Sequence, residues 1–235
     1  MVSSQRVLLV AAEPREFDGL AAHCSGMRTL DWPVYWAREA ECAGRQFWMV
    51  ANGAGPVHAA RAVDAACTNS QPDAIVSAGF CGALDPALTI GDVFVATAIE
   101  SAGERFDACR PQTEAPHATG VVASIDHVAG TAAEKQALRA SGASAVEMEA
   151  AGVARRAAAN HVPLYCVRSV TDLARQDFTL DFNRALRSDG HFDTISILKS
   201  ALRKPRTALP ELFRLRQNCQ VATRTLGEFI AGCRF

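Results

Sequence analysis

Continuous runs of Val, Ile, Leu and Ala recur along the chain, and segments with helical spacing of apolar residues lie between several of them. A run without alternation is typical of a strand that is buried on both faces. The runs predict strands over residues 7–11, 47–51, 74–78, 93–98, 121–124 and 164–170. The intervening periodicity predicts helices over residues 14–22, 57–67, 131–141 and 147–160.

Alternation of strand and helix is the signature of βαβ units, in which consecutive strands lie parallel in one sheet. The pattern therefore predicts an α/β fold. We expect a single three-layer αβα domain over residues 1–235, built around a central, mainly parallel (mixed) sheet. A chain of 235 residues is long enough to bury one large core.

The character of the chain changes after about Asp189. From there to Phe235, eight Lys or Arg residues stand against four acidic residues, so residues 190–235 form a basic extension. Apolar residues at spacings of three and four predict an amphipathic C-terminal helix that begins near Pro210. Its stripe consists of Leu212, Leu215, Cys219, Ala222, Leu226, Phe229 and Ile230. Two interpretations stay open: the helix packs on the domain, or it makes a peripheral contact with an anionic membrane.

Composition and charge exclude several classes of protein. With 49% hydrophobic and 21% charged residues, the chain is not intrinsically disordered. Its net charge of -1 provides no field for nucleic acid, so no nucleic-acid partner is expected. The apolar run over residues 7–12 is too short for a signal sequence or a membrane span, which predicts a cytoplasmic protein. The histidines and cysteines show no ligand spacing, so neither a metal nor a cofactor is implied.

Polar residues that directly follow buried strands are the candidates for chemistry, because ligands of α/β sheets bind beyond the carboxyl ends of the strands. Glu16 follows the first strand, with Arg15 beside it. A carboxylate there either activates a water or complements a helix N-terminus. The turn Gly-Phe-Cys-Gly at 79–82 either brings backbone N–H groups to a ligand or only reverses the chain. A G-x-G at 53–55 lacks the third glycine of dinucleotide-binding loops and predicts a strand-to-helix turn.

Two further motifs are more specific. Residues 145–150 read Ala-Val-Glu-Met-Glu-Ala at a strand-to-helix junction, and residues 169–172 read Ser-Val-Thr-Asp at the end of the last predicted strand. On a helix, Glu147 and Glu149 would lie about 200° apart. We therefore expect only one of these two acids to face a pocket.

Together these motifs resemble the nucleoside phosphorylase and nucleosidase superfamily, most closely its methylthioadenosine/S-adenosylhomocysteine nucleosidases. The resemblance covers most of residues 5–175 and implies the fold of that superfamily. Members of the superfamily are commonly dimers or hexamers, so the resemblance also implies a homo-oligomer. Its small-molecule partner would be a nucleoside.

The resemblance assigns roles to single residues. Glu16 matches the carboxylate that activates the attacking water. Glu149 matches the acid that holds the ribose hydroxyls, and Met148 matches the methionine that lies along the sugar. Asp172 matches the aspartate that protonates or hydrogen-bonds a purine ring nitrogen, with Thr171 beside it.

The same resemblance implies substrate contacts from two other segments. In the glycine turn these are Phe80, Cys81 and Gly82, and Phe80 stands where the nucleosidases have a hydroxyl. Where the nucleosidases place a phenylalanine against the base, this chain has His127 and Val128.

Cleavage of an N-ribosidic bond passes through an oxocarbenium-like sugar, so the base needs a proton and the ribose needs nearby negative charge. Phosphorylases of the superfamily carry an arginine before the glycine turn and a Ser or Thr within it, and this chain has neither. The sequence therefore predicts a hydrolase that cleaves a 5′-modified adenosine and releases adenine. The alternatives are a purine nucleoside phosphorylase that uses Arg15 and forms ribose 1-phosphate, and a non-catalytic nucleoside-binding protein.

The C-terminal region is similar to that of hopanoid-associated phosphorylase-like proteins, in the segments 181–184, 188–190 and 204–205 and in the basic helix. Those proteins are proposed to remove adenine from adenosylhopane. The similarity implies a lipid nucleoside of that type as an alternative substrate. It also suggests that the helix, with Phe80 and Phe182, borders the 5′ side of the ribose.

Overall fold

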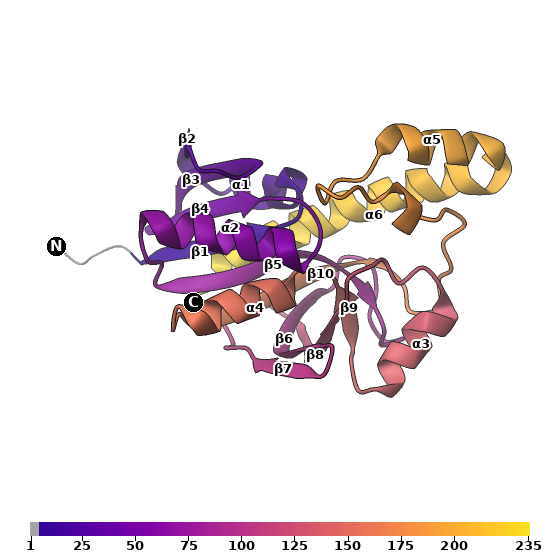
Figure 1. Cartoon of the computed structure of the whole chain (residues 1–235). Coiled ribbons are helices and arrows are strands. Elements are labelled where there is room, and N and C mark those ends of the chain that lie inside the picture. The colour runs from indigo at the N-terminus through magenta and orange to yellow at the C-terminus, as the bar shows by residue number, and fades with distance from the viewer. Residues whose placement is uncertain (1–4) are drawn as a thin grey trace.

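The computed structural model describes residues 5–235, in which one mixed sheet of ten strands is covered by helices on both faces (Figure 1). The strands are β1 (Arg6–Ala11), β2 (Ser25–Thr29), β3 (Trp36–Cys42), β4 (Arg45–Ala51), β5 (Ala74–Ala83), β6 (Val93–Ser101), β7 (Glu104–Asp107), β8 (Ala118–Ser124), β9 (Ala145–Glu147) and β10 (Leu164–Asp172). The helices are α1 (Asp18–Ala21), α2 (Pro56–Asn69), α3 (Ala132–Ala140), α4 (Ala150–Ala159), α5 (Thr194–Arg203) and α6 (Pro205–Gly232), with the 3-10 turns η1 (Pro14–Phe17) and η2 (Asn183–Ala185).

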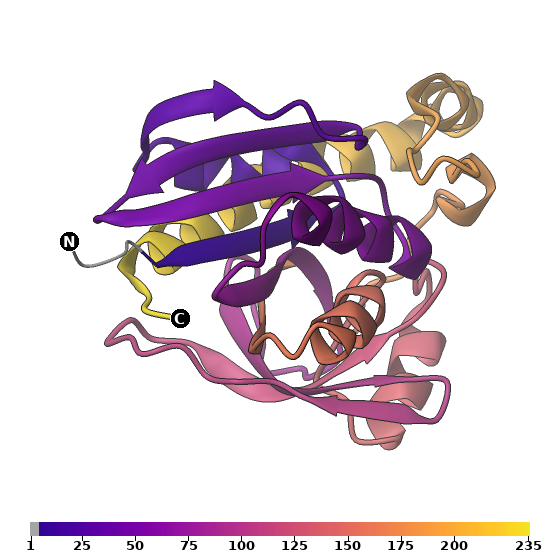
Figure 2. The ribbon, with the colours of Figure 1, turned by 60° about the vertical axis from the view of Figure 1, so that its left-hand side comes forward.

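Five strands of the sheet close into a ring. β10 pairs in parallel with β5 and antiparallel with β6, and the pairing continues from β6 through β8 and β9 back to β5. The strands β1, β4, β3 and β2 extend from β5 as an open, twisted sheet (Figure 2). The closure brings the carboxyl ends of β5, β8, β9 and β10 close to one another, next to the end of β1.

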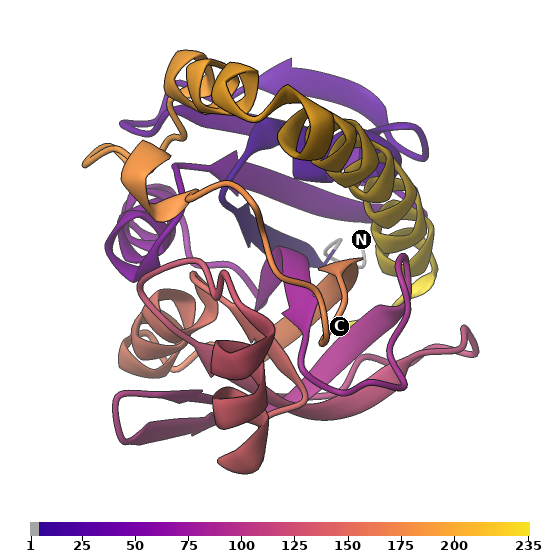
Figure 3. The same cartoon turned by 90° about the vertical axis from the view of Figure 1, so that its right-hand side faces the viewer.

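The core has two layers, one on each face of the sheet. α2 and α4 lie side by side on one face, and α1 and α6 cover the opposite face (Figures 2 and 3). β1 shows how the sequence serves both layers, because Leu8 and Val10 pack toward α2 and α4 while Val7 and Leu9 pack toward α6. The predicted three-layer α/β architecture is confirmed, and no helix of residues 5–235 has both the length and the apolarity needed to cross a bilayer.

The predicted strands and helices are all present, with shifts at their ends, but four strands were missed. β2 is exposed along its whole length, and β3 has buried residues separated by half-buried or exposed ones. A search for continuous apolar runs finds only strands buried on both faces, so partly exposed strands such as β2, β3 and β7 escape it. β9 lies at the predicted strand-to-helix junction, but its last residue, Glu147, falls within the helix predicted over residues 147–160, although α4 begins only at Ala150.

The C-terminal region is a helical hairpin, α5 and α6, rather than one helix that begins at Pro210. Pro205 occupies the first helical position, where a missing N–H costs nothing, and Pro210 lies in the second turn of α6. The C-terminal half of the predicted stripe is buried under the sheet, which confirms the packing interpretation for that half. The buried residues are Ala222, Leu226, Phe229 and Ile230.

α6 and α1 approach so closely that only glycine fits between them. A Cβ added at Gly227 would lie 2.1 Å from the carbonyl carbon of Gly19. Gly227→Ala is expected to lower the Tm by about 5 °C, since overpacking of this kind costs roughly 1–3 kcal/mol. Thermal unfolding followed by circular dichroism measures the shift. Gly232→Ala in the same helix is the matched control, because an added Cβ there meets nothing within 4 Å. Equal Tm values for the two variants would contradict the close contact.

Candidate active site

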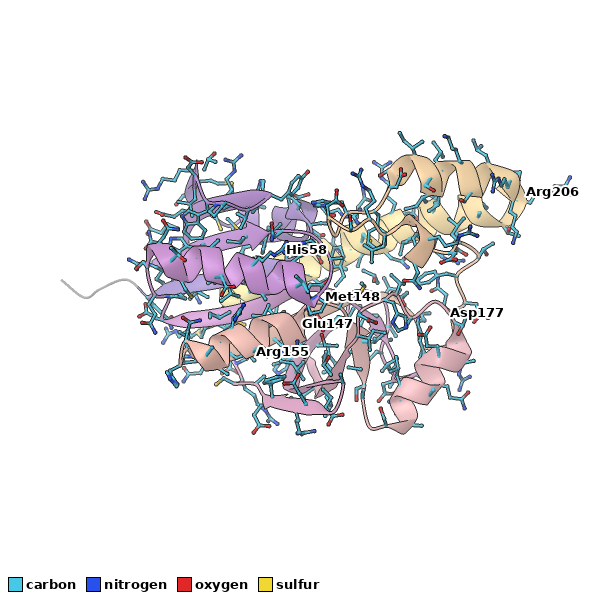
Figure 4. The ribbon with its side chains drawn as sticks, in the orientation of Figure 1. His58, Glu147, Met148, Arg155, Asp177 and Arg206 are labelled. Carbon is cyan, nitrogen blue, oxygen red and sulfur yellow. The ribbon has the colours of Figure 1, made fainter. Side chains whose placement is uncertain are left out.

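A cavity of about 200 Å³ lies at the carboxyl ends of β1, β5, β9 and β10. Every residue that the sequence assigned to catalysis or substrate binding lines this one cavity. These residues are Glu16, Phe80, Cys81, Gly82, His127, Val128, Met148, Glu149, Thr171 and Asp172. Figure 4 shows Glu147 and Met148 near the middle of the molecule, between the helical layer and the strand ends.

Glu16 is held by backbone groups on both of its carboxylate oxygens. The N–H of Phe80 donates to Oε1 at 2.9 Å, and the N–H of Glu13 donates to Oε2 at 2.8 Å. Burial raises the pKa of Glu16 above its usual 4.5. Gly79 makes this position possible, because its φ is +145° and a Cβ there would lie 2.6 Å from Oε1. The result is a fixed carboxylate that takes up a proton more readily than one in water.

Glu149 precedes the first turn of α4 and points into the cavity. Its Oε1 accepts a hydrogen bond from the N–H of Gly55 at 3.1 Å, and its Oε2 lies 3.6 Å from Nη1 of Arg168. The G-x-G turn at 53–55 thus positions a predicted ligand-binding acid, although neither of its glycines lines the cavity. Burial, followed by the nearby charge of Glu147, raises the pKa of Glu149 to about 8.

Glu147 and Glu149 both line the cavity, so the expectation that only one of them would face a pocket was wrong. The expectation assumed a helix, but β9 ends at Glu147 and α4 begins only at Ala150. Their partners nevertheless differ. Oε2 of Glu147 accepts hydrogen bonds from the N–H groups of Glu149 at 2.9 Å and Ala150 at 2.8 Å, and it pairs with Arg168. Glu147 therefore stabilises the turn between β9 and α4.

Arg168 is fully buried in the middle of β10, and the sequence analysis gave it no role. Its Nη2 donates to Glu147 and to Oγ of Ser77 at 2.6 Å, and its Nη1 donates to the carbonyl of Ala78 at 3.1 Å. Burial alone would lower the pKa of Arg168, but the neighbouring carboxylates, first that of Glu147, raise it. The sequence does carry a signal, since an arginine within an apolar strand demands a buried partner.

Asp172 lies at an irregularity of β10 that places it opposite Gly82 of β5. The hydroxyl of Thr171 donates to its Oδ1 at 3.0 Å, and Nζ of Lys135 donates to its Oδ2. A Cβ at Gly82 would lie 2.8 Å from Oδ2, so glycine is needed there. Lys135 was missed by the sequence analysis, because the apolar pattern of α3 gives no sign that a lysine is the side chain this helix buries.

The side of the cavity near Asp172 has a histidine and an aromatic ring from different segments. His127 lies between the carboxylates of Asp126, at 2.8 Å, and Glu134, at 2.6 Å, and these hydrogen bonds raise its pKa. Phe178 also lines the cavity. It supplies an aromatic face that residues 124–129 lack.

The opposite side of the cavity is apolar. Ala12, Ala54 and Met148 form a buried cluster against which Phe192 packs. Phe80 lines the cavity as expected, but Phe182 and the residues of α6 do not. Phe182 instead packs edge-to-face against Phe178 and Phe192, which do line the cavity. Phe182 and the C-terminal helix therefore do not form the expected wall; Phe178 and Phe192, which belong to the same segment between β10 and α5 as Phe182, line the cavity instead.

Comparison with known proteins agrees with this geometry. The model of the phosphorylase superfamily matches residues 6–117 and 104–199. The chain belongs to the phosphorylase superfamily. This match confirms the resemblance to the superfamily that the motifs indicated.

Two kinds of relative are similar to it. A 5′-methylthioadenosine/S-adenosylhomocysteine nucleosidase from Staphylococcus aureus strain JH9 is 28% identical over 171 residues, which cover 60% of this chain and 75% of the relative. The Neisseria meningitidis nucleosidase of the same name, solved with methylthio-immucillin-A, aligns with a TM-score of 0.70 at 18% identity, over 97% of this chain and 99% of that chain. Futalosine hydrolase of Helicobacter pylori aligns with a TM-score of 0.70 at 16% identity, over 97% and 96% of the two chains. The two solved structures show a shared fold.

The raised pKa of Glu149 predicts how stability depends on pH. The folded chain holds a proton on Glu149 up to about pH 8, whereas the unfolded chain releases it near pH 4.5. The folded state therefore binds more protons between these values, so this group makes the free energy of unfolding fall as the pH rises. Urea unfolding at pH 6 and pH 8 is expected to show a fall that is about 1–2 kcal/mol larger in the wild type than in Glu149→Gln. Parallel pH dependences in the two proteins would contradict the prediction.

Proposed function

We propose that this protein is a hydrolase that cleaves the N-ribosidic bond of a purine nucleoside, a 5′-modified adenosine, and releases adenine. The observation that carries the proposal is the convergence of Glu16, Glu149 and Asp172 on one cavity, from three separate segments of the chain. The names of the related nucleosidases support the same reaction.

Each of the three acids has a distinct task in this reaction. Glu16 takes a proton from the attacking water, a task suited to a carboxylate whose pKa is raised by burial. Glu149 hydrogen-bonds the ribose hydroxyls, and its ionised form, which the raised pKa makes the minor one below about pH 8, brings negative charge toward the oxocarbenium-like sugar. As the bond between C1′ and the base breaks, its electron pair goes to the purine. Asp172 lies where it can protonate or hydrogen-bond the purine ring nitrogen.

The charges around the cavity favour water over phosphate as the nucleophile. The guanidinium of Arg168 is already bound by Glu147, Ser77 and the carbonyl of Ala78. Glu16, Glu147 and Glu149 surround it, and these acids repel a phosphate dianion. Arg15 lines the cavity and is the cation through which the alternative phosphorylase reaction would have to work.

The apolar side of the cavity supports a 5′ substituent that is not charged. Ala12, Ala54, Met148 and Phe192 offer no polar side-chain group to it. A cavity of about 200 Å³ is too small to enclose a nucleoside with a large lipid, so the lipid part would have to extend out of the cavity opening. A lipid nucleoside of the adenosylhopane type is thus the alternative to a small 5′ group.

We further propose that the hairpin of α5 and α6 makes a peripheral contact with an anionic membrane. It projects from the domain (Figure 1), and Arg206 marks its far end (Figure 4). We call the exposed apolar side chains on it the hairpin apolar surface, of which Ile195 is 67%, Leu202 61% and Phe213 64% exposed. Its other members are Leu198 and Leu209.

Charge around the hairpin apolar surface is almost entirely positive. Between residues 194 and 216 the one acid is Glu211, which is buried and accepts hydrogen bonds from the N–H groups of Thr179 and Leu180. The exposed cations are Lys199, Arg203, Lys204, Arg206, Arg214 and Arg216. Apolar side chains rimmed by cations fit an anionic lipid surface. The contact differs from the one expected from the sequence, because half of that stripe is buried.

We also propose two broader properties: the protein is a homo-oligomer, as the family resemblance implies, and it works in the cytoplasm.

The reaction is tested by incubation with adenosine, methylthioadenosine and inosine, with and without phosphate, followed by chromatography of base and sugar. Free adenine and unphosphorylated sugar are expected in phosphate-free buffer. Asp172→Asn is expected to lower kcat by about 10²–10⁴-fold with nucleoside affinity largely retained, because its contact matters most in the transition state. Asp107→Asn, an exposed change on β7, is the control.

Other outcomes of this assay would replace the proposal. Base release only with phosphate, together with ribose 1-phosphate, would make the protein a phosphorylase. Binding of nucleosides without any turnover would make it a nucleoside-binding protein.

Membrane contact is tested by sedimentation with vesicles of phosphatidylcholine, alone or mixed with phosphatidylglycerol. Binding to the mixed vesicles is expected, and added salt should weaken it. Replacing Leu202 and Phe213 together by Gln should reduce binding about tenfold or more, since each removes apolar area from the contact. Met27→Gln, an exposed apolar residue on β2, is the control.

The proposal fails if the protein does not sediment with anionic vesicles, or if it binds neutral vesicles equally well. It also fails if the variant at Leu202 and Phe213 instead abolishes an oligomer in size-exclusion chromatography. In that case the hairpin apolar surface is covered by a second copy of the chain.

A further inference from the structure

A second cavity, of about 800 Å³, lies at the amino ends of the strands, at the opposite end of the sheet from the candidate active site. Gln5 directly precedes β1, Arg45 begins β4 and Tyr165 lies at the start of β10, and all three line this cavity. The C-terminal end of the chain lies beside the start of β1 (Figure 2), where Gln5 donates to the backbone oxygen of Phe235. The length of β10 separates the two cavities by roughly 20 Å.

The lining of the second cavity is basic, and we call it the arginine cavity. Arg45, Arg110 and Arg234 line it together with the amides of Gln5 and Gln112, and no acidic side chain within residues 5–235 does so. In the same part of the chain, none of the three arginines is ion-paired with an acid. The candidate active site, by contrast, is lined mainly by acids. The two cavities therefore attract opposite charges.

Arg45 uses only part of its hydrogen-bonding capacity. Its Nη2 donates to the carbonyl of Ala231 at 2.8 Å, which places a cation at the negative end of the α6 dipole. Its Nη1 is buried and has no hydrogen-bond partner among the described residues, whereas nearly all buried polar groups are bonded. The contact with α6 therefore accounts for part of this guanidinium, and it accounts for neither Arg110 nor Arg234.

Three guanidiniums around one cavity repel one another, and an anion that they share removes the repulsion. Phosphate fits a guanidinium best, because the planar N–H fork bonds two phosphate oxygens at once. A monophosphate carries about −1.5 to −2 charges at pH 7 and leaves one guanidinium unbalanced, whereas a second phosphate group supplies the missing charge. The number of arginines therefore favours a diphosphate.

We propose that the arginine cavity binds the diphosphate group of a small soluble ligand, either free pyrophosphate or a nucleoside diphosphate. The rings of Tyr165 and Phe235, with centroids 5.2 Å apart, line the same cavity and offer apolar surface to the rest of a nucleotide. A membrane that holds the hairpin would lie at the far end of α6, roughly 42 Å away. The headgroups of that membrane do not reach the cavity.

Isothermal titration calorimetry of the full chain with pyrophosphate at low salt tests the site. The wild type is expected to bind. The double variant Arg110→Gln/Arg234→Gln is expected to bind about tenfold or more weakly, since each change removes a hydrogen bond to a charged group. Both side chains are exposed, so this variant should fold. Arg224→Gln removes an exposed arginine of α6 outside the cavity and is the matched control.

Nucleoside cleavage separates the arginine cavity from the proposed function. It should be equal in the wild type, the double variant and Arg224→Gln, because none of the three substituted arginines lines the candidate active site. Loss of cleavage in the double variant would contradict the independence of the two cavities. A wild type that binds pyrophosphate but cleaves no nucleoside would leave the arginine cavity supported and the nucleosidase function wrong.

Three results would overturn the proposal. The first is a wild type that does not bind pyrophosphate. The second is an equal loss of affinity in Arg224→Gln, which would make the binding an effect of overall charge. The third is loss of binding in Arg15→Gln with full binding in the double variant, which would place the anion at the candidate active site.

Titration with uridine diphosphate identifies the source of the diphosphate group. Tighter binding of uridine diphosphate than of pyrophosphate, weakened in the double variant, supports a nucleoside diphosphate. Equal or weaker binding supports free pyrophosphate. If the double variant instead loses sedimentation with phosphatidylglycerol vesicles and keeps its affinity for both soluble probes, the arginines contact lipid and the proposal is wrong.

Discussion

The guanidinium of Arg168 lies inside the sheet, where only fixed acceptors can compensate its charge. Those acceptors come from two other strands: Glu147 at the end of β9, and Ser77 and Ala78 in β5. The buried ion pair therefore ties together strands that are distant in the sequence, at the point where the ring of strands closes. Removal of either partner would leave a buried charge without its counter-charge, so the packing of β5, β9 and β10 beneath the cavity depends on this pair.

Around that pair, the acids of the cavity are held by different means. Backbone N–H groups hold Glu16, the turn at Gly55 holds Glu149, and an ammonium holds Asp172. Hydrogen bonds from rigid backbone allow a carboxylate to exchange a proton without moving. Burial raises the pKa of both Glu16 and Glu149, so these two acids keep a proton at a higher pH than they would in water.

The sequence predicted much of this arrangement, because strands buried on both faces leave a strong apolar signal and because the motif residues follow those strands directly. Each residue that the motifs assigned to the site lines the cavity, and most of them do so because they follow the end of a buried strand. Lys135 and Phe178 were out of reach, since their partners lie in other elements and only the folded chain brings them together. Edge strands such as β2 and the junction at Glu147 were missed because local apolarity carries no information about pairing with another strand.

The continuity of α6 has a mechanical consequence. This helix of 28 residues, roughly 42 Å long, bonds near its middle to the carbonyl of Thr171 through Asn218 and farther along to the carbonyl of Arg15 through Thr223. Its N-terminal turns form the hairpin. The hairpin and the strand ends around the cavity are thus parts of one stiff body, so a surface that holds the hairpin also fixes the angle at which the cavity faces it. For a substrate anchored in that surface, the search for the enzyme would take place in two dimensions instead of three.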